Sequence, residues 1–275
     1  MDGKADLHMH TTYSDGALSP RDVIVKAKAA GLHTISITDH DTVGGLEESL
    51  ALGKQYDIGI VPGVELSATL NDREIHILGY FMDHHNKILV DSLAEFRVER
   101  LRRAERIVGK LNKMNIPLSM ESVLANTSGD CIGRPHIANA LVSEGHAEDY
   151  HQAFRKYIGD GKPAFEKKVC FSPAATVNLI AEAGGLSFLA HPGKTISEEF
   201  LIQLIDAGLD GIEVVHPSHT HEHIQYYRGI VSEYCLLECG GSDFHGGKKG
   251  DETVLGQYTI PTTTVDIMRR RLFSN

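Results

Sequence analysis

Residues Thr34–Asp41 have the sequence T-I-S-I-T-D-H-D, a β-branched run followed at once by an imidazole between two carboxylates. The run predicts a strand over Thr34–Thr38. Asp39, His40 and Asp41 then lie just beyond the C-terminal end of that strand. In folds built from alternating strands and helices, ligands gather at this end of the sheet. The segment therefore predicts an α/β fold with its functional site at the strand ends.

Strands and helices alternate on both sides of this segment. Further strands are expected at Lys4–Leu7, Ile58–Leu66, Glu74–Tyr80, Leu186–Ala190, Gly211–Val215 and Leu236–Cys239. Helices are expected after Ser19-Pro20, after Ser172-Pro173 and after Ser197, and over Val43–Tyr56, His221–Glu233 and Thr264–Leu272. This alternation implies a parallel sheet. About six or seven strand–helix units, interrupted once, favour closure into a barrel.

The interruption is a stretch from 85 to 165 in which no strand is expected. Helices are predicted at Lys87–Met114, Met120–Ala125, Pro135–Glu144 and Tyr150–Ile158. We therefore expect a barrel formed by residues 1–84 and 166–275, with residues 85–165 as a small helical insertion. Arg100, Arg103 and Arg106 recur every three residues on the long first helix. Such a row is typical of a solvated face, and the alternative is that one of them reaches a substrate.

Nearly every predicted strand is followed by a histidine or a carboxylate. These residues are His8, His10, Asp15, Asp39, His40, Asp41, Glu65, His191, Asp243 and His245, and His76 lies within its strand. Histidines two apart on a strand point to one side, so His8 and His10 can bind one ion together. Mixed imidazole and carboxylate ligands suit zinc, manganese or iron, and the lack of thiolates argues against a structural zinc site.

Composition limits the possible functions of the 275-residue chain. Its formal net charge of −10 argues against binding to long duplex nucleic acid, although bound ions can make a local cleft positive. No apolar run approaches the roughly 18 residues that span a bilayer, and the N-terminus lacks a signal-peptide pattern. The four cysteines include no C-x-x-C pair. A cytoplasmic protein that does not contact membranes is expected, and its oligomeric state stays open.

The strand-end motifs, taken in order, resemble those of the PHP (polymerase and histidinol phosphatase) superfamily. The motifs are Asp6-Leu7-His8-Met9-His10-Thr11, Thr38-Asp39-His40-Asp41, Gly63-Val64-Glu65, Ala190-His191-Pro192 and Ser242-Asp243-Phe244-His245. The resemblance implies a distorted (β/α)7 barrel that binds up to three divalent ions, with manganese first and iron or zinc as alternatives. Gly133-Arg134-Pro135-His136 in the insertion resembles the TrpH-like branch, which includes a 3′,5′-nucleotide bisphosphate phosphatase and a 5′-to-3′ exoribonuclease.

The same resemblance implies a set of metal ligands. The first ion would be held by His8, His10, Glu65 and Asp243, and Glu65 would bridge to a second ion bound by His76 and His191. A third ion would be held by Asp15, His40 and His245, with Asp15 at a position where some relatives have histidine. Glu65, His191, Asp243 and His245 are the implied catalytic residues.

The expected reaction is hydrolysis of a phosphate ester by attack of a metal-bridging hydroxide. Small nucleotides such as adenosine 3′,5′-bisphosphate, or the ends of short oligonucleotides, are the expected substrates. Arg134 and His136 are the candidates for binding a second phosphate, because arginine recognises phosphate in a bidentate manner; the alternative is a helix start with a solvated arginine. Histidinol phosphate is the rival substrate, and a non-catalytic scaffold module is the rival from another class.

Other polar motifs have simpler interpretations. Asp83-His84-His85 is interpreted as a loop, and His216 as a residue at the rim of the site. His219, His221 and His223 fall at a helix start, where residues two apart do not share a face. Asp39 and Asp41 either orient His40 through its second ring nitrogen or, for Asp41-Thr42, cap the following helix.

Overall fold

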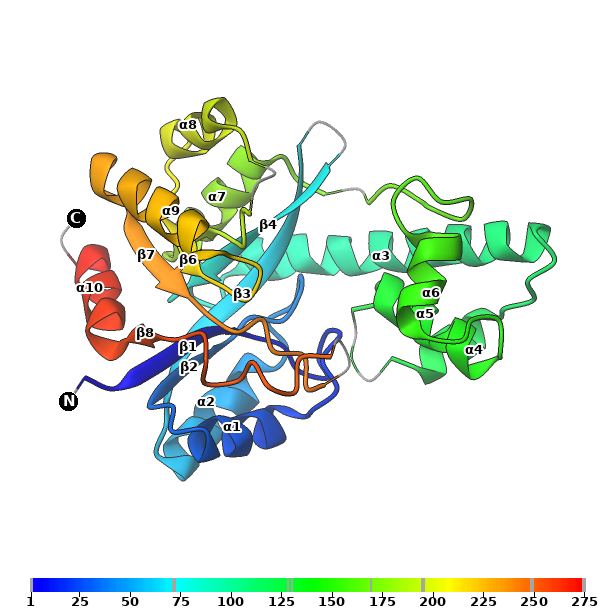
Figure 1. Cartoon of the computed structure of the whole chain (residues 1–275), viewed down its shortest axis with the longest axis horizontal. Coiled ribbons are helices and arrows are strands. Elements are labelled where there is room, and N and C mark those ends of the chain that lie inside the picture. Colours follow the sequence, from blue (N-terminus) through cyan, green and yellow to red (C-terminus); the bar gives the residue numbers. More distant parts are fainter. Residues whose placement is uncertain are drawn as a thin grey trace.

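Eight strands form one sheet in the order β7-β6-β5-β4-β3-β2-β1-β8 (Figure 1). This computed structural model describes residues 2–70, 73–127, 129, 131–168, 170–193, 196–247 and 250–273. The strands are β1 Lys4–Met9, β2 Thr34–Ile37, β3 Gly59–Leu70, β4 Arg73–Tyr80, β5 Leu186–Leu189, β6 Gly211–Val215, β7 Leu237–Gly240 and β8 Ile260–Pro261. All strands predicted from the sequence are present, and β8 is an addition.

The two edges of the sheet approach each other where the chain continues beyond β7. Met9 at the end of β1 forms a parallel bridge with Phe244, and the His10 backbone N–H donates to the Phe244 carbonyl at 2.9 Å. At the other end of β1, Lys4 pairs with Pro261 of β8. The sheet is therefore a nearly closed barrel, as expected, and its closure brings the ends of β1 and β7 together.

The expectation of a wholly parallel sheet is wrong at β4 and β8. β4 runs antiparallel to both β3 and β5, and β8 runs antiparallel to β1. Only two residues separate Leu70 from Arg73, whereas a parallel connection needs a crossover of a dozen or more residues. The hairpin turns the start of β4, which carries His76, toward the same end as the last residues of β3.

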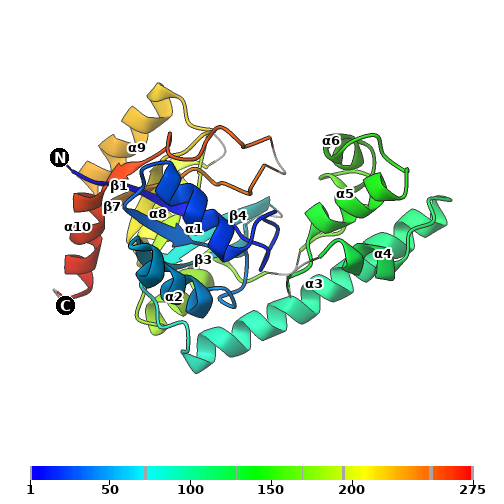
Figure 2. The same ribbon diagram turned by 90° about the horizontal axis from the view of Figure 1, so that it is seen from below.

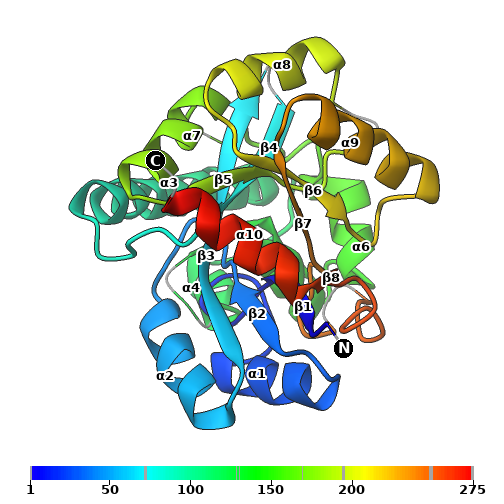
Figure 3. The ribbon, with the colours of Figure 1, turned by 90° about the vertical axis from the view of Figure 1, so that its left-hand side faces the viewer.

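Helices cover the outside of the barrel, and Ser19 and Ser172 cap two of them as predicted. They are α1 Pro20–Ala29, α2 Leu46–Tyr56, α7 Pro173–Glu182, α8 Glu198–Asp206, α9 His221–Glu233 and α10 Thr262–Leu272. Figure 3 shows α10 lying across the end of the barrel that carries the N-terminus. Helix α2 begins three residues later than expected, because Gly44 and Gly45 precede it in a turn.

The middle of the chain is helical and projects from the barrel (Figures 1 and 2). Its elements are α3 Lys87–Lys113, α4 Met120–Ala125, α5 Arg134–Ser143, α6 Tyr150–Ala153 and the π-helix η1 Phe154–Ile158. Apolar residues such as Ile107, Leu111 and Leu141 form a separate buried cluster there. No strand occurs among the described residues of 85–165, as predicted, and the boundaries of an insertion stay a prediction. No described helix is long and apolar enough to cross a membrane.

Candidate metal centre and adjoining pocket

The first predicted group of ligands converges where β1 and β7 end, beside the middle of β3, which carries Glu65. Single nitrogen or oxygen atoms of His8, His10, Glu65 and Asp243 all lie within 4.8 Å of one another. His8 Nε2 and His10 Nε2 are each 3.3 Å from Glu65 Oε2, and His10 Nε2 is 3.1 Å from Asp243 Oδ1. The alternation of β1 directs both histidines to one side of the strand. Four side chains can therefore surround one ion.

Two further groups lie beside the first. Glu65 Oε1 is 2.8 Å from His76 Nδ1 and 3.1 Å from His191 Nε2, so the two carboxylate oxygens face different sets of imidazoles. The third group joins Asp15, His40 and His245, and it also includes His10. His40 Nδ1 lies 3.0 Å from Glu65 Oε2 as well. The nine residues implied by the resemblance thus form one continuous cluster.

Buried polar atoms in this cluster lack hydrogen-bond partners. Among the described residues these atoms include His8 Nε2, both ring nitrogens of His10, His40 Nδ1 and Glu65 Oε2. Burial would raise the pKa of Glu65, but His40, His76 and His8 outweigh it and hold that pKa well below its usual range. Burial lowers the pKa of His40 to about 4, which leaves the ring neutral and able to bind a metal. The donor set therefore fits divalent cations.

A residue missed in the sequence, Glu213 of β6, holds two of these histidines. Glu213 Oε1 lies 2.9 Å from His8 Nδ1, and Oε2 accepts from the His191 backbone N–H at 2.8 Å. Glu213 is fully buried. A carboxylate behind a metal-binding imidazole fixes its orientation and tautomer. The only sequence signal was a single acidic residue within the apolar strand G-I-E-V-V.

Buried aspartates anchor the backbone around the cluster. Asp6 accepts from the backbone N–H groups of His8 at 3.3 Å and Ser242 at 2.9 Å, and burial raises the pKa of Asp6 to about 7. Asp251 accepts from the backbone N–H groups of His245 and Gly247. These contacts tie the segment after β7 to β1 and to the loop that follows.

His216 is buried, contrary to its expected place at the rim, with 6% of its surface exposed. Its Nδ1 accepts from the Ser218 backbone N–H at 3.1 Å and lies 2.7 Å from the Ser218 hydroxyl. Nε2 lies 3.7 Å from Asp243 Oδ2. The ring therefore faces the back of the Asp243 carboxylate, whose other oxygen faces His8 and His10.

The described contacts of Asp39 and Asp41 include neither a contact that orients the His40 ring nor a cap of α2 by Asp41. Asp39 accepts from the backbone N–H and hydroxyl of Thr11 at 2.8 and 2.6 Å, and thus orders the loop that carries Asp15. Asp41 accepts from Ser67 N–H at 2.7 Å and from Arg100 Nε at 2.9 Å. The N-cap of α2 is Gly45, with no side-chain hydrogen bond.

Strained backbone occurs at three strand ends of the site. Asp41, His191 and Asp243 have φ angles of 50°, 27° and 51°, in the left-handed region that L-residues seldom occupy. Such strain persists only where surrounding contacts enforce it, and it clusters at functional sites. The contacts of Asp41 with Ser67 and of His191 with Glu213 are of this kind.

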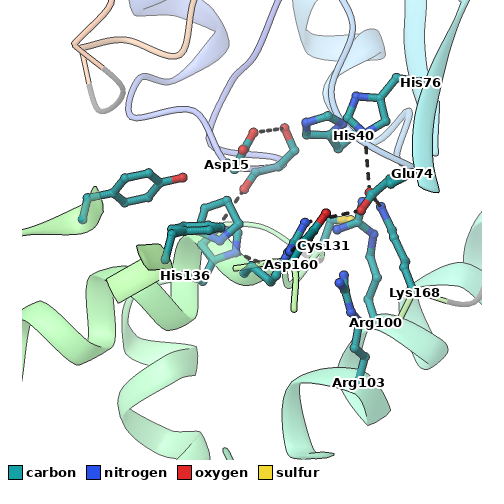
Figure 4. A pocket seen from close by; sticks show the side chains of 16 residues that line it. Asp15, His40, Glu74, His76, Arg100, Arg103, Cys131, His136, Asp160 and Lys168 are labelled. Atoms are coloured by element: carbon teal, nitrogen blue, oxygen red, sulfur yellow. Dashed lines mark hydrogen bonds and ion pairs between the residues drawn. The ribbon is translucent and has the colours of Figure 1, made fainter. Parts of the chain in front are cut away.

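A pocket of about 360 Å³ adjoins the cluster (Figure 4). Asp15, His40 and His76 line one side of it. The opposite wall carries Arg100, Arg103 and Lys168, with Glu74 between them and His76. Arg134 also lines the pocket, with its Nη2 3.6 Å from Glu74 Oε2, and these four cationic residues are called the cationic wall. Lys168 Nζ lies 2.9 Å from Glu74 Oε1. The pocket thus connects the imidazole–carboxylate cluster to a cationic wall.

The row of arginines on α3 was expected to face solvent. This expectation is wrong for Arg100 and Arg103, which are 8% and 6% exposed. It is correct for Arg106, which is exposed. Arg103 Nε donates to the Glu166 carbonyl at 2.9 Å. Its Nη2 is buried and has no hydrogen-bond partner among the described residues. Burial lowers the pKa of Arg103 to about 10, so the guanidinium remains charged at neutral pH. An anion in the pocket would satisfy this group.

Arg134 and His136 differ in what they present to the pocket. Arg134 lies between the Phe154 and Phe165 rings, and its Nη1 donates to Asp160 Oδ1 at 2.5 Å. His136 Nδ1 accepts from Gly133 N–H at 3.0 Å, and its Nε2 lies 3.1 Å from the Ser14 carbonyl. Both ring nitrogens of His136 are therefore engaged within the protein, and its direct contact with substrate stays a prediction.

Comparisons with known proteins identify the family of this chain. Residues 6–166 match the PHP domain family model. The chain is 34% identical to a 5′-3′ exoribonuclease from Haemophilus influenzae, over 89% of this chain and 91% of the relative. It is 33% identical to a 3′,5′-nucleoside bisphosphate phosphatase from Chromobacterium violaceum, over 96% and 95% of the two chains. A structure described as a metal-dependent phosphoesterase, from Bifidobacterium adolescentis, superposes with a TM-score of 0.90 at 32% identity, over 97% and 96% of the chains. The chain therefore belongs to the PHP family.

Proposed function

We propose that this protein is a metal-dependent phosphoesterase that hydrolyses 3′,5′-bisphosphonucleosides, such as adenosine 3′,5′-bisphosphate, or the ends of short oligonucleotides. One observation carries the proposal: the pocket joins an imidazole–carboxylate cluster to a wall of four cationic side chains. One of them, Arg103, has a buried donor without a hydrogen-bond partner among the residues that the structure describes. A substrate with two phosphates spaced by a ribose matches these two binding regions.

The cluster would hold up to three divalent ions. His8, His10, Glu65 and Asp243 would bind one, His76 and His191 would share Glu65 with the second, and Asp15, His40 and His245 would bind the third. Manganese is the first choice, with iron or zinc as alternatives, because nitrogen and carboxylate donors suit these metals. When bound, such ions supply an activated water and neutralise charge on the phosphoryl group.

The side chains at the two ends of the pocket have different roles in this proposal. The phosphoester to be cleaved lies at the cluster, where Glu65, His191, Asp243 and His245 are the catalytic residues. Arg103, Arg134 and Lys168 bind the second phosphate through charged hydrogen bonds. Hydrolysis breaks the P–O ester bond and water supplies the new oxygen on phosphorus. The departing alkoxide oxygen takes up a proton that the water gives up, and becomes a hydroxyl. All nine candidate ligands are present, which disfavours the scaffold alternative.

Histidinol phosphate fits this pocket less well. Its amine is cationic at neutral pH, and the wall opposite the cluster presents Arg100, Arg103, Arg134 and Lys168. Like charges in a partly buried pocket repel each other strongly. The same four cations would attract the second phosphate of a nucleotide. The proposal also includes a cytoplasmic location and no binding to long duplexes, and it leaves the oligomeric state open.

A substrate panel with the manganese-loaded protein tests the proposal. Phosphate release should be faster from adenosine 3′,5′-bisphosphate or from short 5′-phosphorylated RNA than from histidinol phosphate. The reverse ranking would reject the substrate class. No manganese-stimulated hydrolysis of any phosphoester, together with no bound transition metal, would reject the enzymatic function.

A further inference from the structure

A second group of possible metal ligands lies outside the catalytic cluster and shares no residue with it. It consists of Glu47, near the start of α2, and the adjacent His84 and His85, in the turn between β4 and α3. Figure 2 shows the beginning of α3 close to α2. One ligand atom from each of the three side chains lies within 4.8 Å of the other two.

The distances within this group match those between ligands on a single ion. His84 Nε2 and His85 Nε2 are 3.3 and 3.5 Å from the same atom, Glu47 Oε2. Bonds of about 2.1 Å to a tetrahedral zinc ion place neighbouring ligand atoms about 3.4 Å apart. The two rings also lie side by side, with centroids 4.1 Å apart. Both imidazoles are therefore directed at one carboxylate oxygen with the separation that a shared cation requires.

The backbone holds the two histidines in this arrangement. Asp83 Oδ1 accepts from the His85 backbone N–H at 2.9 Å, and the Asn86 N–H donates to the Asp83 carbonyl at 2.9 Å. Asn86 then caps α3 through the N–H groups of Ile88 and Leu89. Because this turn is ordered by its own hydrogen bonds, a cation would not have to order it on binding.

We propose that Glu47, His84 and His85 bind one divalent cation of the zinc class, with water completing the coordination. Two imidazoles and a carboxylate favour zinc, copper or nickel over magnesium or calcium. The side chains of Glu47 and His85 are 78% and 72% exposed, and that of His84 is 15% exposed, so an ion has access from solvent. The ion would tie α2 to the start of α3, the helix that carries Arg100 and Arg103 to the pocket. This site does not depend on the proposed function.

Zinc binding by the full-length protein tests this site. Equilibrium dialysis with zinc alone is compared for the wild type, His84→Ala/His85→Ala, Glu47→Gln, and the control His151→Ala, which removes an exposed histidine on α6. We expect the double variant to bind one equivalent of zinc fewer than the wild type. Glu47→Gln should weaken the same site by at least about tenfold, the loss that removal of even an outer-shell partner causes. The control should match the wild type.

Two readouts separate this site from the catalytic cluster. Manganese-dependent phosphoesterase activity should be equal in all four proteins, because none of the substituted residues belongs to the cluster. Addition of zinc should raise the melting temperature of the wild type more than that of the double variant, since the ion links two elements of the native state. Equal zinc stoichiometry and affinity in the wild type and the double variant would overturn the proposal.

Discussion

Arg100 of α3 and Asp41 of the loop after β2 form a buried ion pair, with Arg100 Nε 2.9 Å from Asp41 Oδ2. Lys168 Nζ lies 3.2 Å from the same oxygen. One carboxylate, next in sequence to His40, thus anchors two of the four cations of the pocket wall. The position of the helical part of the chain is coupled through this carboxylate to the candidate metal centre.

Asp41→Asn should destabilise the metal-free protein by about 3 kcal/mol, because it removes the carboxylate that pairs with the buried Arg100 and leaves Lys168 with Glu74 alone. Burial raises the pKa of Asp41, but Lys168 and Arg100 outweigh it and hold the pKa below its usual range. A depressed native pKa means that the stabilisation is present above the unfolded-state pKa of about 4 and is lost as pH falls below it. Denaturant unfolding should therefore show the difference from wild type shrinking below about pH 4.

Asp57→Asn serves as the control for that series. Asp57 is an exposed residue with a φ of 52°, a conformation that asparagine also tolerates, so its substitution should change stability little. A difference between Asp41→Asn and wild type that stays constant through acid pH would contradict the electrostatic account.

Glu65→Gln and His191→Ala should abolish turnover and lower the bound metal, because each removes a ligand next to the others in the cluster. Elemental analysis of the purified variants measures the loss directly. Chelation of the wild type should also remove activity and lower the melting temperature, since the ions bind only the native state, and added manganese should restore both. Full activity and full metal content in both variants would refute the proposed ligand set.

Glu213→Gln should lower metal affinity or activity by about 10- to 100-fold, the usual effect of losing a partner behind a metal-binding histidine. Because the residue positions His8 and His191 without touching substrate, excess manganese should recover part of the activity. The neighbouring Glu238→Gln, which removes only an exposed pair with Arg228, is the matched control. If Glu213→Gln and Glu238→Gln had the same metal affinity and activity, Glu213 would have no positioning role.

Arg103→Ala should raise KM for adenosine 3′,5′-bisphosphate by about 10- to 100-fold, because a hydrogen bond to a charged group contributes about 1.5–3 kcal/mol. Arg134→Ala should act in the same direction. KM for a substrate with a single phosphate, such as 4-nitrophenyl phosphate, should change little. Arg106→Ala, on the same helix but exposed, is the control. If KM rose equally for both substrates, these arginines would not bind a second phosphate.

The sequence by itself determined where the candidate metal ligands lie relative to the predicted strands. The two-residue spacing in β1 directs His8 and His10 to one side, and the position of Glu65, His191 and Asp243 near strand ends predicted that they would meet. These are consequences of local periodicity and of the common direction of most strands, which short windows of sequence contain. The helices between residues 85 and 165 follow from local periodicity too.

Only the tertiary structure determined which side chains position the metal ligands and line the pocket. Glu213 meets His8 across 205 positions of sequence, and Arg103 has the same local pattern as the exposed Arg106 yet is buried against the pocket. Glu47 approaches His84 and His85 only because the fold brings the start of α2 to the turn between β4 and α3. Burial and long-range polar contacts arise from how whole elements pack, and no local pattern encodes them.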